Sequence, residues 1–160
     1  MKNMQQWFDA YGQSHQNHTN KLIHWICVPL IFFSLIGLLA SIPSDALKAP
    51  FPPVVQPYIH FGTVLVLLGL LFYLRLSFTM FLGMALICAV VLWAIHTLDA
   101  ATSTPLWLIC LVVFVLAWAG QFYGHKVEGK KPSFFNDLQF LLIGPAWLLG
   151  FIYRKLGIPY

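Results

Sequence analysis

Charged residues are scarce in this chain. Lys, Arg, Asp and Glu make up 9% of its 160 residues, whereas hydrophobic residues make up 59% and the mean hydropathy is +0.77. A soluble domain carries about 25% charged residues, so this composition excludes an ordinary soluble domain and indicates an integral membrane protein with lipid as a partner. No nucleic-acid partner is expected from the net charge of +4, because no basic helix and no aromatic-lined basic segment accompanies it.

Cysteine is also scarce. Cys27, Cys88 and Cys110 all lie inside apolar stretches without a CxxC spacing. This pattern predicts buried small hydrophobic residues and neither a disulfide nor a soft-metal site. We also expect no cleavable signal peptide, because residues 1–20 are polar and no small-residue cleavage site follows the first apolar stretch.

Long apolar stretches dominate the rest of the chain. Each has about the 20 residues that a bilayer core requires of a helix, and the proline-rich connection from Pro43 to Pro57 cannot be a helix throughout. We predict an all-α, integral membrane helical bundle with about four transmembrane helices, at Leu22–Ile42, Tyr58–Leu74, Phe78–Leu98 and Leu106–Tyr123. The chain is expected to form one membrane domain, with an N-terminal interfacial helix in 1–21, the four-helix core in 22–123 and a C-terminal part in 124–160.

The C-terminal apolar stretch, Phe134–Leu156, is interrupted by Asn136, Asp137 and Gly144-Pro145. A lipid-facing span would leave backbone groups unsatisfied at such a break. We therefore predict an interfacial or re-entrant helical segment, with a fifth span as the alternative.

Basic residues predict the orientation. Four spans would place eight of the nine Lys and Arg residues on one side, which indicates that both termini are cytoplasmic. These eight are Lys2, Lys21, Arg75, Lys126, Lys130, Lys131, Arg154 and Lys155. His60 and His96 then fall at the opposite ends of their spans, where we interpret them as interfacial anchors.

Two polar clusters border the first and last of these spans, on the predicted cytoplasmic side. His15, His18, Asn20 and His24 surround the start of the first, and the stripe Gln121, His125 and Glu128 ends the last. Imidazoles with a carboxylate are ligands that Fe(II), Mn(II) or Zn(II) accept. His15 and His24 lie about 180° apart on one ideal helix, so both can bind one ion only if the chain bends between them. Glu128, within EGKK, is equally explained as a solvated charge.

The two clusters belong to longer motifs, YGQSHQNHTNKLIHWICVP at 11–29 and WAGQFYGHKVEGKKPSFF at 118–135, followed by GP at 144–145. These motifs resemble the small membrane family of the fungal 2-hydroxy fatty acid dioxygenase, which also has bacterial members. The resemblance implies an Fe(II) enzyme that uses O2 to convert a 2-hydroxy fatty acid to the acid one carbon shorter. It implies the endoplasmic reticulum membrane for eukaryotic relatives and the inner membrane for a bacterial member.

Within these motifs, we expect His15, His24 and His125 to bind the metal. His18 ranks below them, because relatives need not have histidine there. Glu128 is expected as a fourth ligand or proton acceptor. The other motif positions expected to contact substrate or support the ligands are Tyr11, Asn20 and Gln121.

Two non-enzymatic functions stay open from the sequence. A small membrane transporter or metal carrier would show metal flux without product, although the spans carry almost no intramembrane charge for a conduction path. A membrane assembly partner would tolerate every histidine substitution. Gly62, Gly69 and Gly83 would allow close helix approach, which leaves a homo-oligomer open.

Overall fold

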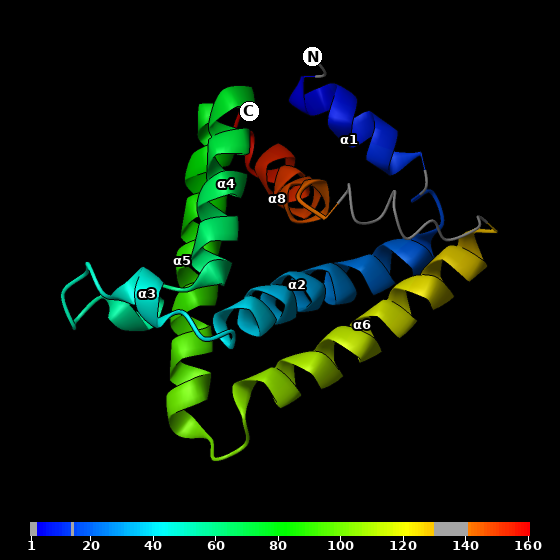
Figure 1. The fold of residues 1–160 in the computed structure, drawn as a ribbon. Helices are drawn as coiled ribbons and strands as arrows, with labels where there is room; N and C mark the ends of the chain where they lie inside the picture. Colours follow the sequence, from blue (N-terminus) through cyan, green and yellow to red (C-terminus); the bar gives the residue numbers. More distant parts are fainter. Residues whose placement is uncertain (1–2, 14, 130–140) are drawn as a thin grey trace.

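The computed structural model describes residues 3–13, 15–129 and 141–160, and every regular element in them is helical (Figure 1). The predicted all-α fold is therefore confirmed. The elements in chain order are α1 (Met4–Gly12), α2 (His18–Ala40), α3 (Asp45–Lys48), the 3-10 turn η1 (Gln56–Tyr58), α4 (Phe61–Leu76), α5 (Phe78–Ala101), α6 (Leu106–Glu128) and α8 (Ile143–Leu156).

Three of the described helices, α2, α5 and α6, are long and apolar enough to cross a membrane. α4 has 16 residues, which extend about 24 Å, less than a bilayer core of about 30 Å. It is shorter than the predicted span because the chain before it forms η1 and His60 caps the helix. The structure fits a membrane protein, and the fourth span stays a prediction. The proline-rich connection holds only α3 and η1, as expected for a segment that is not a continuous helix.

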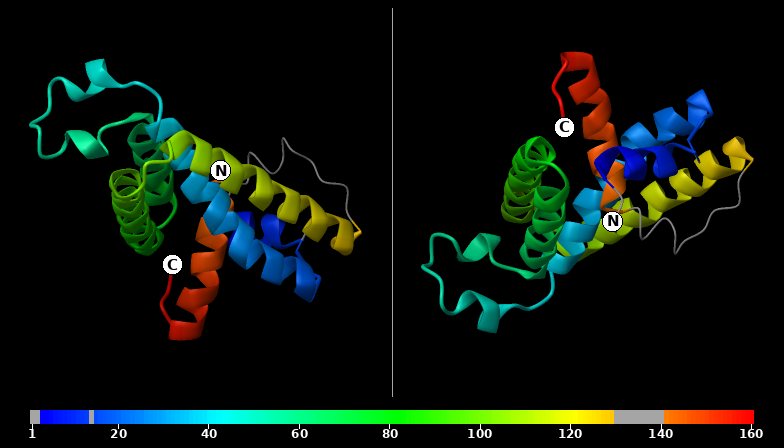
Figure 2. Two further views of the ribbon diagram at one scale, coloured as in Figure 1. Left: turned by 90° about the horizontal axis from the view of Figure 1, so that it is seen from below. Right: turned by 90° about the horizontal axis from the view of Figure 1, so that it is seen from above.

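Two antiparallel pairs form the frame. α2 packs along α6 and α4 along α5, and the two pairs cross steeply instead of running side by side (Figures 1 and 2). Glycine allows α2 and α6 to approach closely, because a Cβ on Gly120 would lie 2.7 Å from Cys27 Sγ and one on Gly37 would overlap Cys110 Sγ. Cys27, Cys88 and Cys110 are free and buried, as predicted.

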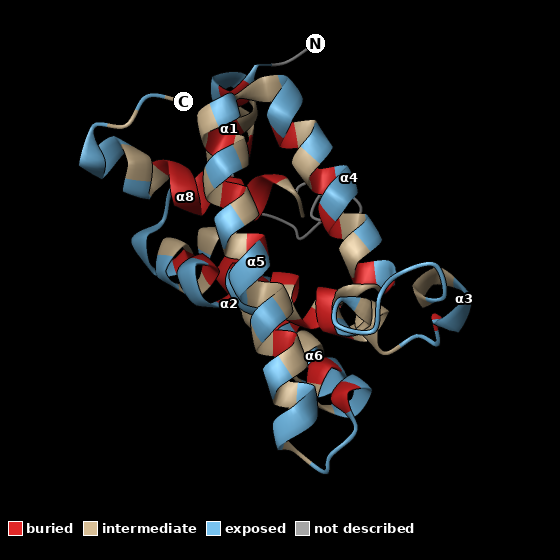
Figure 3. Ribbon diagram, turned by 90° about the vertical axis from the view of Figure 1, so that its left-hand side faces the viewer, coloured by how far each residue is buried: buried red, intermediate tan, exposed pale blue. Residues whose placement is uncertain are grey.

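α8 is buried along its first eight residues, Ile143–Gly150, among α1, α2 and α5 (Figure 3). Pro145 lies in its first turn, where a backbone N–H has no intrahelical partner. Gly144-Pro145 therefore belongs to the start of a helix and does not interrupt one, contrary to our expectation. With 14 residues, α8 is shorter than the roughly 20 that cross a bilayer, which favours the re-entrant interpretation over a fifth span. Residues 134–140 of the predicted segment lie outside the described residues.

α1 covers α8. Asn3 and Gln6 form a capping box at its start, and Met4, Phe8 and Tyr11 are buried at i, i+4 and i+7 spacing. A Cβ on Gly150 of α8 would lie 2.7 Å from the Phe8 ring. The predicted N-terminal helix is thus present, and its apolar face packs against the protein.

Three glycines that could have allowed contact between two copies of the protein, Gly62, Gly69 and Gly83, instead pack against residues of the same chain. A Cβ on Gly62 would lie 2.6 Å from the carbonyl oxygen of Ile36, and one on Gly69 would lie 3.3 Å from Leu142. A Cβ on Gly83 would overlap the Tyr153 hydroxyl. These glycines therefore bring α4 against α2, and α5 against α8.

Candidate metal centre

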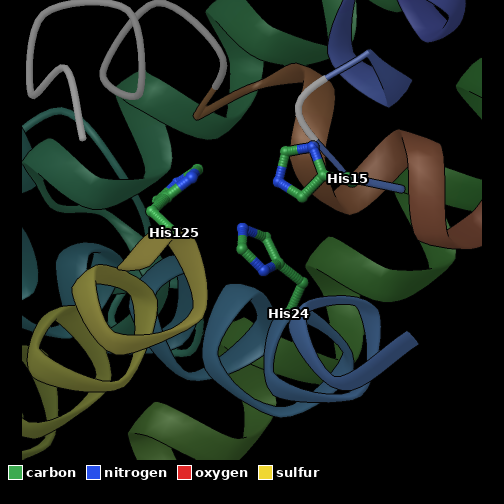
Figure 4. Close-up of side chains that lie close together, drawn as sticks. All are labelled: His15, His24 and His125. Atoms are coloured by element: carbon green, nitrogen blue, oxygen red, sulfur yellow. The ribbon is translucent and has the colours of Figure 1, made fainter. Parts of the chain in front are cut away.

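Three histidines from different parts of the chain meet in the interior. His15 lies between α1 and α2, His24 lies on α2, and His125 lies in the last turn of α6. One ligand atom from each lies within 4.8 Å of the others, and their side chains are 3%, 1% and 5% exposed. Figure 4 shows the three rings directed toward a common space. The two sequence clusters are therefore brought together, as the topology predicted.

The chain bends between His15 and His24, as their separation on an ideal helix required. α1 ends at Gly12, and α2 begins at His18 with Asn17 as its N-cap. The Asn17 side chain accepts hydrogen bonds from the N–H groups of Thr19 (2.8 Å) and Asn20 (3.4 Å). His15 consequently approaches His24 from a connection and not from the same helix.

Backbone carbonyls determine the orientation of two rings. His15 Nδ1 lies 2.7 Å from the carbonyl oxygen of Tyr11, and His24 Nδ1 lies 2.9 Å from that of Asn20. A carbonyl oxygen only accepts hydrogen bonds, so each Nδ1 carries the hydrogen in the neutral ring. Each Nε2 then keeps its lone pair, which is the usual arrangement of a metal-binding histidine.

The cluster fits a single transition-metal ion. Metal–imidazole bonds are about 2.1 Å long, so two nitrogens on one ion are at most about 4.2 Å apart. The observed limit of 4.8 Å is slightly wider, and small ring movements close that difference. Imidazole ligands suit iron, zinc, copper or nickel.

Aromatic side chains close the centre toward α1 and α8. Tyr11 stacks on His15 with ring centroids 4.2 Å apart, and Trp147 lies 5.1 Å from Tyr11 and 5.5 Å from His15. Gly144 allows this packing, because a Cβ there would lie 3.3 Å from the Tyr11 hydroxyl and 3.1 Å from Val28. The sequence contains no signal for Trp147, which stands among apolar residues of the C-terminal stretch.

A family model described as "2-hydroxy-palmitic acid dioxygenase Mpo1-like" matches residues 1–156. The chain belongs to the Mpo1-like family. The resemblance inferred from the two motifs is thereby confirmed over nearly the whole chain. No curated protein and no solved structure matches it.

Glu128 of this Mpo1-like chain lies beside the centre and not in the three-histidine cluster. Its carboxylate accepts hydrogen bonds from the backbone N–H groups of Gln16 (2.8 Å) and Asn17 (2.9 Å) and from Asn20 Nδ2 (2.9 Å). Both oxygens are used, so the carboxylate joins the end of α6 to the connection that carries His15. These contacts fix the position of Glu128, whose side chain stays partly exposed to solvent.

Asn20 links this carboxylate to the histidines. Its side chain is fully buried and donates to Glu128, while its backbone carbonyl accepts from His24. Gly124 leaves room for it, since a Cβ there would overlap Asn20 Oδ1. Asn20 therefore supports the His24 tautomer through its backbone.

Gln121 faces a small cavity beside the cluster. The cavity has a volume of about 30 Å³, which is enough for one or two water-sized molecules. Gln121 is 6% exposed, and its Oε1 atom is buried without a hydrogen-bond partner among the described residues. Such an atom costs about 1–3 kcal/mol unless a water or ligand donates to it, so Gln121 is a candidate contact for a molecule in the cavity. The lining residues are Tyr11, His24, Val28, Ile31, Trp118, Gln121, His125, Leu141 and Gly144.

The other histidines lie apart from the centre. His18 is exposed at the first position of α2 and is not in the three-histidine cluster. His60 is 4% exposed, and its Nδ1 accepts a hydrogen bond from the Thr63 N–H at 3.2 Å. His96 packs against Tyr58 with ring centroids 5.1 Å apart. His60 is thus a buried helix cap and not the interfacial anchor that we expected.

Proposed function

We propose that this protein is an Fe(II)-dependent dioxygenase of 2-hydroxy fatty acids. The reaction is R–CH(OH)–COOH + O2 → R–COOH + CO2 + H2O. The acid loses four electrons and O2 gains four, so no further reductant is required. The buried cluster of His15, His24 and His125 carries this proposal, together with the family description.

The donor set supports an acidic substrate. Three neutral imidazoles do not compensate the charge of a divalent ion, and burying an uncompensated charge is costly. A 2-hydroxy carboxylate brings one negative charge and two oxygen ligands, and it leaves a position for O2. Bound iron would supply the oxygen chemistry, and the protein supplies placement and exclusion of water.

The surrounding residues have separate proposed roles. We assign the Gln121 side chain to accept a hydrogen bond from the substrate hydroxyl, because Gln121 lines the small cavity and its Oε1 is buried without a partner among the described residues. The Tyr11 ring shields His15. Glu128 and Asn20 are proposed as positioning residues for the His15 and His24 ligands. His18 is a weaker ligand candidate because it is exposed.

The cytoplasmic location of the centre and of both termini is also a proposal. Lys21 of α2 and Arg154 of α8 line one cleft. The Tyr153 hydroxyl donates to the Thr79 carbonyl at 3.0 Å, which brings the end of α8 to the α4–α5 turn beside Arg75. Lys21, Arg75 and Arg154 thus border the same part of the described structure, which supports the positive-inside assignment.

The test is anaerobic purification in detergent, addition of Fe(II) and then of air with 2-hydroxypalmitic acid, and mass spectrometry of the product. We expect pentadecanoic acid and CO2. Alanine at any cluster histidine should remove at least 90% of stoichiometric metal and all turnover, because each is one of the three ligands that we propose among the described residues. His60→Ala is the matched control and should keep both. Stoichiometric iron without product in the wild-type protein would refute the proposed reaction.

A further inference from the structure

His15 also lines a second hollow. This cleft lies between α1, α2 and α8 and has a volume of about 490 Å³, within the range of about 300–1,000 Å³ that ligand sites occupy. His24 and His125 line the small cavity instead. The cleft therefore gives access to the centre at His15.

The cleft carries excess positive charge. Lys21 from the first turn of α2 and Arg154 from α8 both line it, against one acidic residue among the described lining residues, Asp9. Asp9 already accepts a hydrogen bond from Gln5 Nε2 at 2.7 Å. Two cations beside a candidate metal ligand favour an anionic group in this cleft.

Aromatic residues of α8 connect the charged cleft to α2. Trp147, Phe151 and Arg154 share one face of α8, with the Trp147 and Phe151 rings 4.6 Å apart and Arg154 Cζ 4.6 Å from the Phe151 centroid. On α2, Trp25 follows Lys21 by one helical turn. The rings of Trp25 and Phe151 lie 6.1 Å apart. This contact links the face of α2 that carries Lys21 to the face of α8 that carries Arg154.

An apolar groove lies beyond this ring contact. It has a volume of about 180 Å³ between α2, α5 and α8, and its lining includes Trp25, Pro29, Val91 and Leu148. No charged residue is among the described residues that line it. A volume below about 300 Å³ does not enclose a whole drug-sized ligand, so a long chain would continue from the groove into surrounding lipid.

We infer that the cleft and the groove together seat one amphiphilic acid, with its carboxylate between Lys21 and Arg154 beside His15 and its acyl chain along the apolar groove. This inference rests on the proposed function and extends it. In this arrangement, Lys21 and Arg154 select a free acid over a neutral ester. The residues of α5 and α8 that line the groove determine the preferred chain length. The change from a charged cleft to an apolar groove matches a long-chain acid, in which an alkyl chain follows a charged carboxylate.

The charged end is tested by tryptophan fluorescence titration in detergent, with 2-hydroxypalmitic acid and its methyl ester as probes. Lys21→Met and Arg154→Met should each raise the Kd of the acid about 2–5-fold, the effect of removing one partly solvated ion pair. The Kd of the ester should not change. Lys126→Met and Lys155→Met are controls, because these cations line neither hollow. Equal effects of controls and test variants would overturn the assignment, as would tighter binding of a phosphatidic acid than of the hydroxy acid.

The apolar end is tested by filling the groove. Val91→Trp should raise the Kd of 2-hydroxypalmitic acid several-fold and leave that of 2-hydroxyoctanoic acid unchanged. Val90→Trp is the matched control, because Val90 is 54% exposed and does not line the groove. Unchanged chain-length preference in Val91→Trp would remove the groove from the inference.

The two proposals fail separately. If the wild-type protein binds the acid through Lys21 and Arg154 but forms no shorter acid, the proposed reaction fails and the cleft stands. If the variant that combines Lys21→Met and Arg154→Met converts the acid with an unchanged KM and an unchanged preference for acid over ester, the reaction stands and the cleft assignment fails.

Discussion

The substitution Glu128→Gln tests whether the Glu128 carboxylate positions the histidine ligands or binds the metal itself. The substitution keeps the shape and removes the charge. One carboxylate oxygen becomes an NH2 group that faces donors, either the backbone N–H of Gln16 at Oε1 or the backbone N–H of Asn17 and the side chain of Asn20 at Oε2. Hydrogen bonds to a charged group contribute about 1.5–3 kcal/mol each, and the partial exposure of Glu128 places these at the lower end. Losing two of them costs about 3 kcal/mol and loosens the connection that holds His15.

The expected result is weaker metal binding with unchanged coordination. Loss of a group that orients a ligand lowers metal affinity about 10–100-fold. Titration with Co(II), followed by its visible absorption, measures both properties in one experiment. The saturated variant should show the wild-type spectrum with a raised Kd, and Asp99→Asn, at the far end of α5, is the control carboxylate. A changed spectrum at saturation would show that Glu128 is a ligand, and a wild-type Kd would refute any role in positioning.

Two further substitutions test the cavity wall. Gln121→Leu removes a buried acceptor that has no described partner, so the protein should stay at least as stable and should bind metal normally. Its turnover should fall about 10–100-fold, equivalent to about 1.4–2.7 kcal/mol. Full turnover in this variant would exclude contact between Gln121 and the reactants. Gly144→Ala places a Cβ 3.1 Å from Val28. Overpacking costs about 1–3 kcal/mol and alanine gains about 1 kcal/mol over glycine in a helix, so stability should fall by up to about 2 kcal/mol, measured by thermal unfolding in detergent. Gly12→Ala, whose Cβ would lie 3.8 Å from the nearest atom, Trp147 Nε1, is its tolerant control.

The meeting of His15, His24 and His125 could be predicted from the sequence because it depends on topology alone. The sequence predicts four apolar helices from the first span to the last, so an up-and-down arrangement places the start of the first and the end of the last on the same side. The bend before His18 was predictable too, since nine residues on one helix would have placed His15 and His24 on opposite faces. Both predictions needed only helix geometry and the positions of polar residues.

The position of α8 was not predictable in the same way. Its residues from Ile143 to Gly150 are buried on all sides, so no apolar stripe indicates which neighbour it contacts. The steep crossing of the α4–α5 pair over the α2–α6 pair has the same origin, because helices that are apolar all round carry no preferred face. Trp147 reaches His15 through this packing, and only the three-dimensional structure reveals it.

Glu128 is different, because a signal for its position was present in the sequence. The first N–H groups of a helix have no intrahelical acceptor and attract negative charge. The first turn of α2 contains no acidic residue, and Asn17 satisfies only the N–H groups of Thr19 and Asn20. A carboxylate from elsewhere stabilises this end, and Glu128, the acidic residue that ends the antiparallel neighbour, accepts from the Asn17 N–H. The sequence alone left this explanation and a solvated EGKK segment equally open, and the hydrogen bonds of Glu128 to Gln16, Asn17 and Asn20 favour the first.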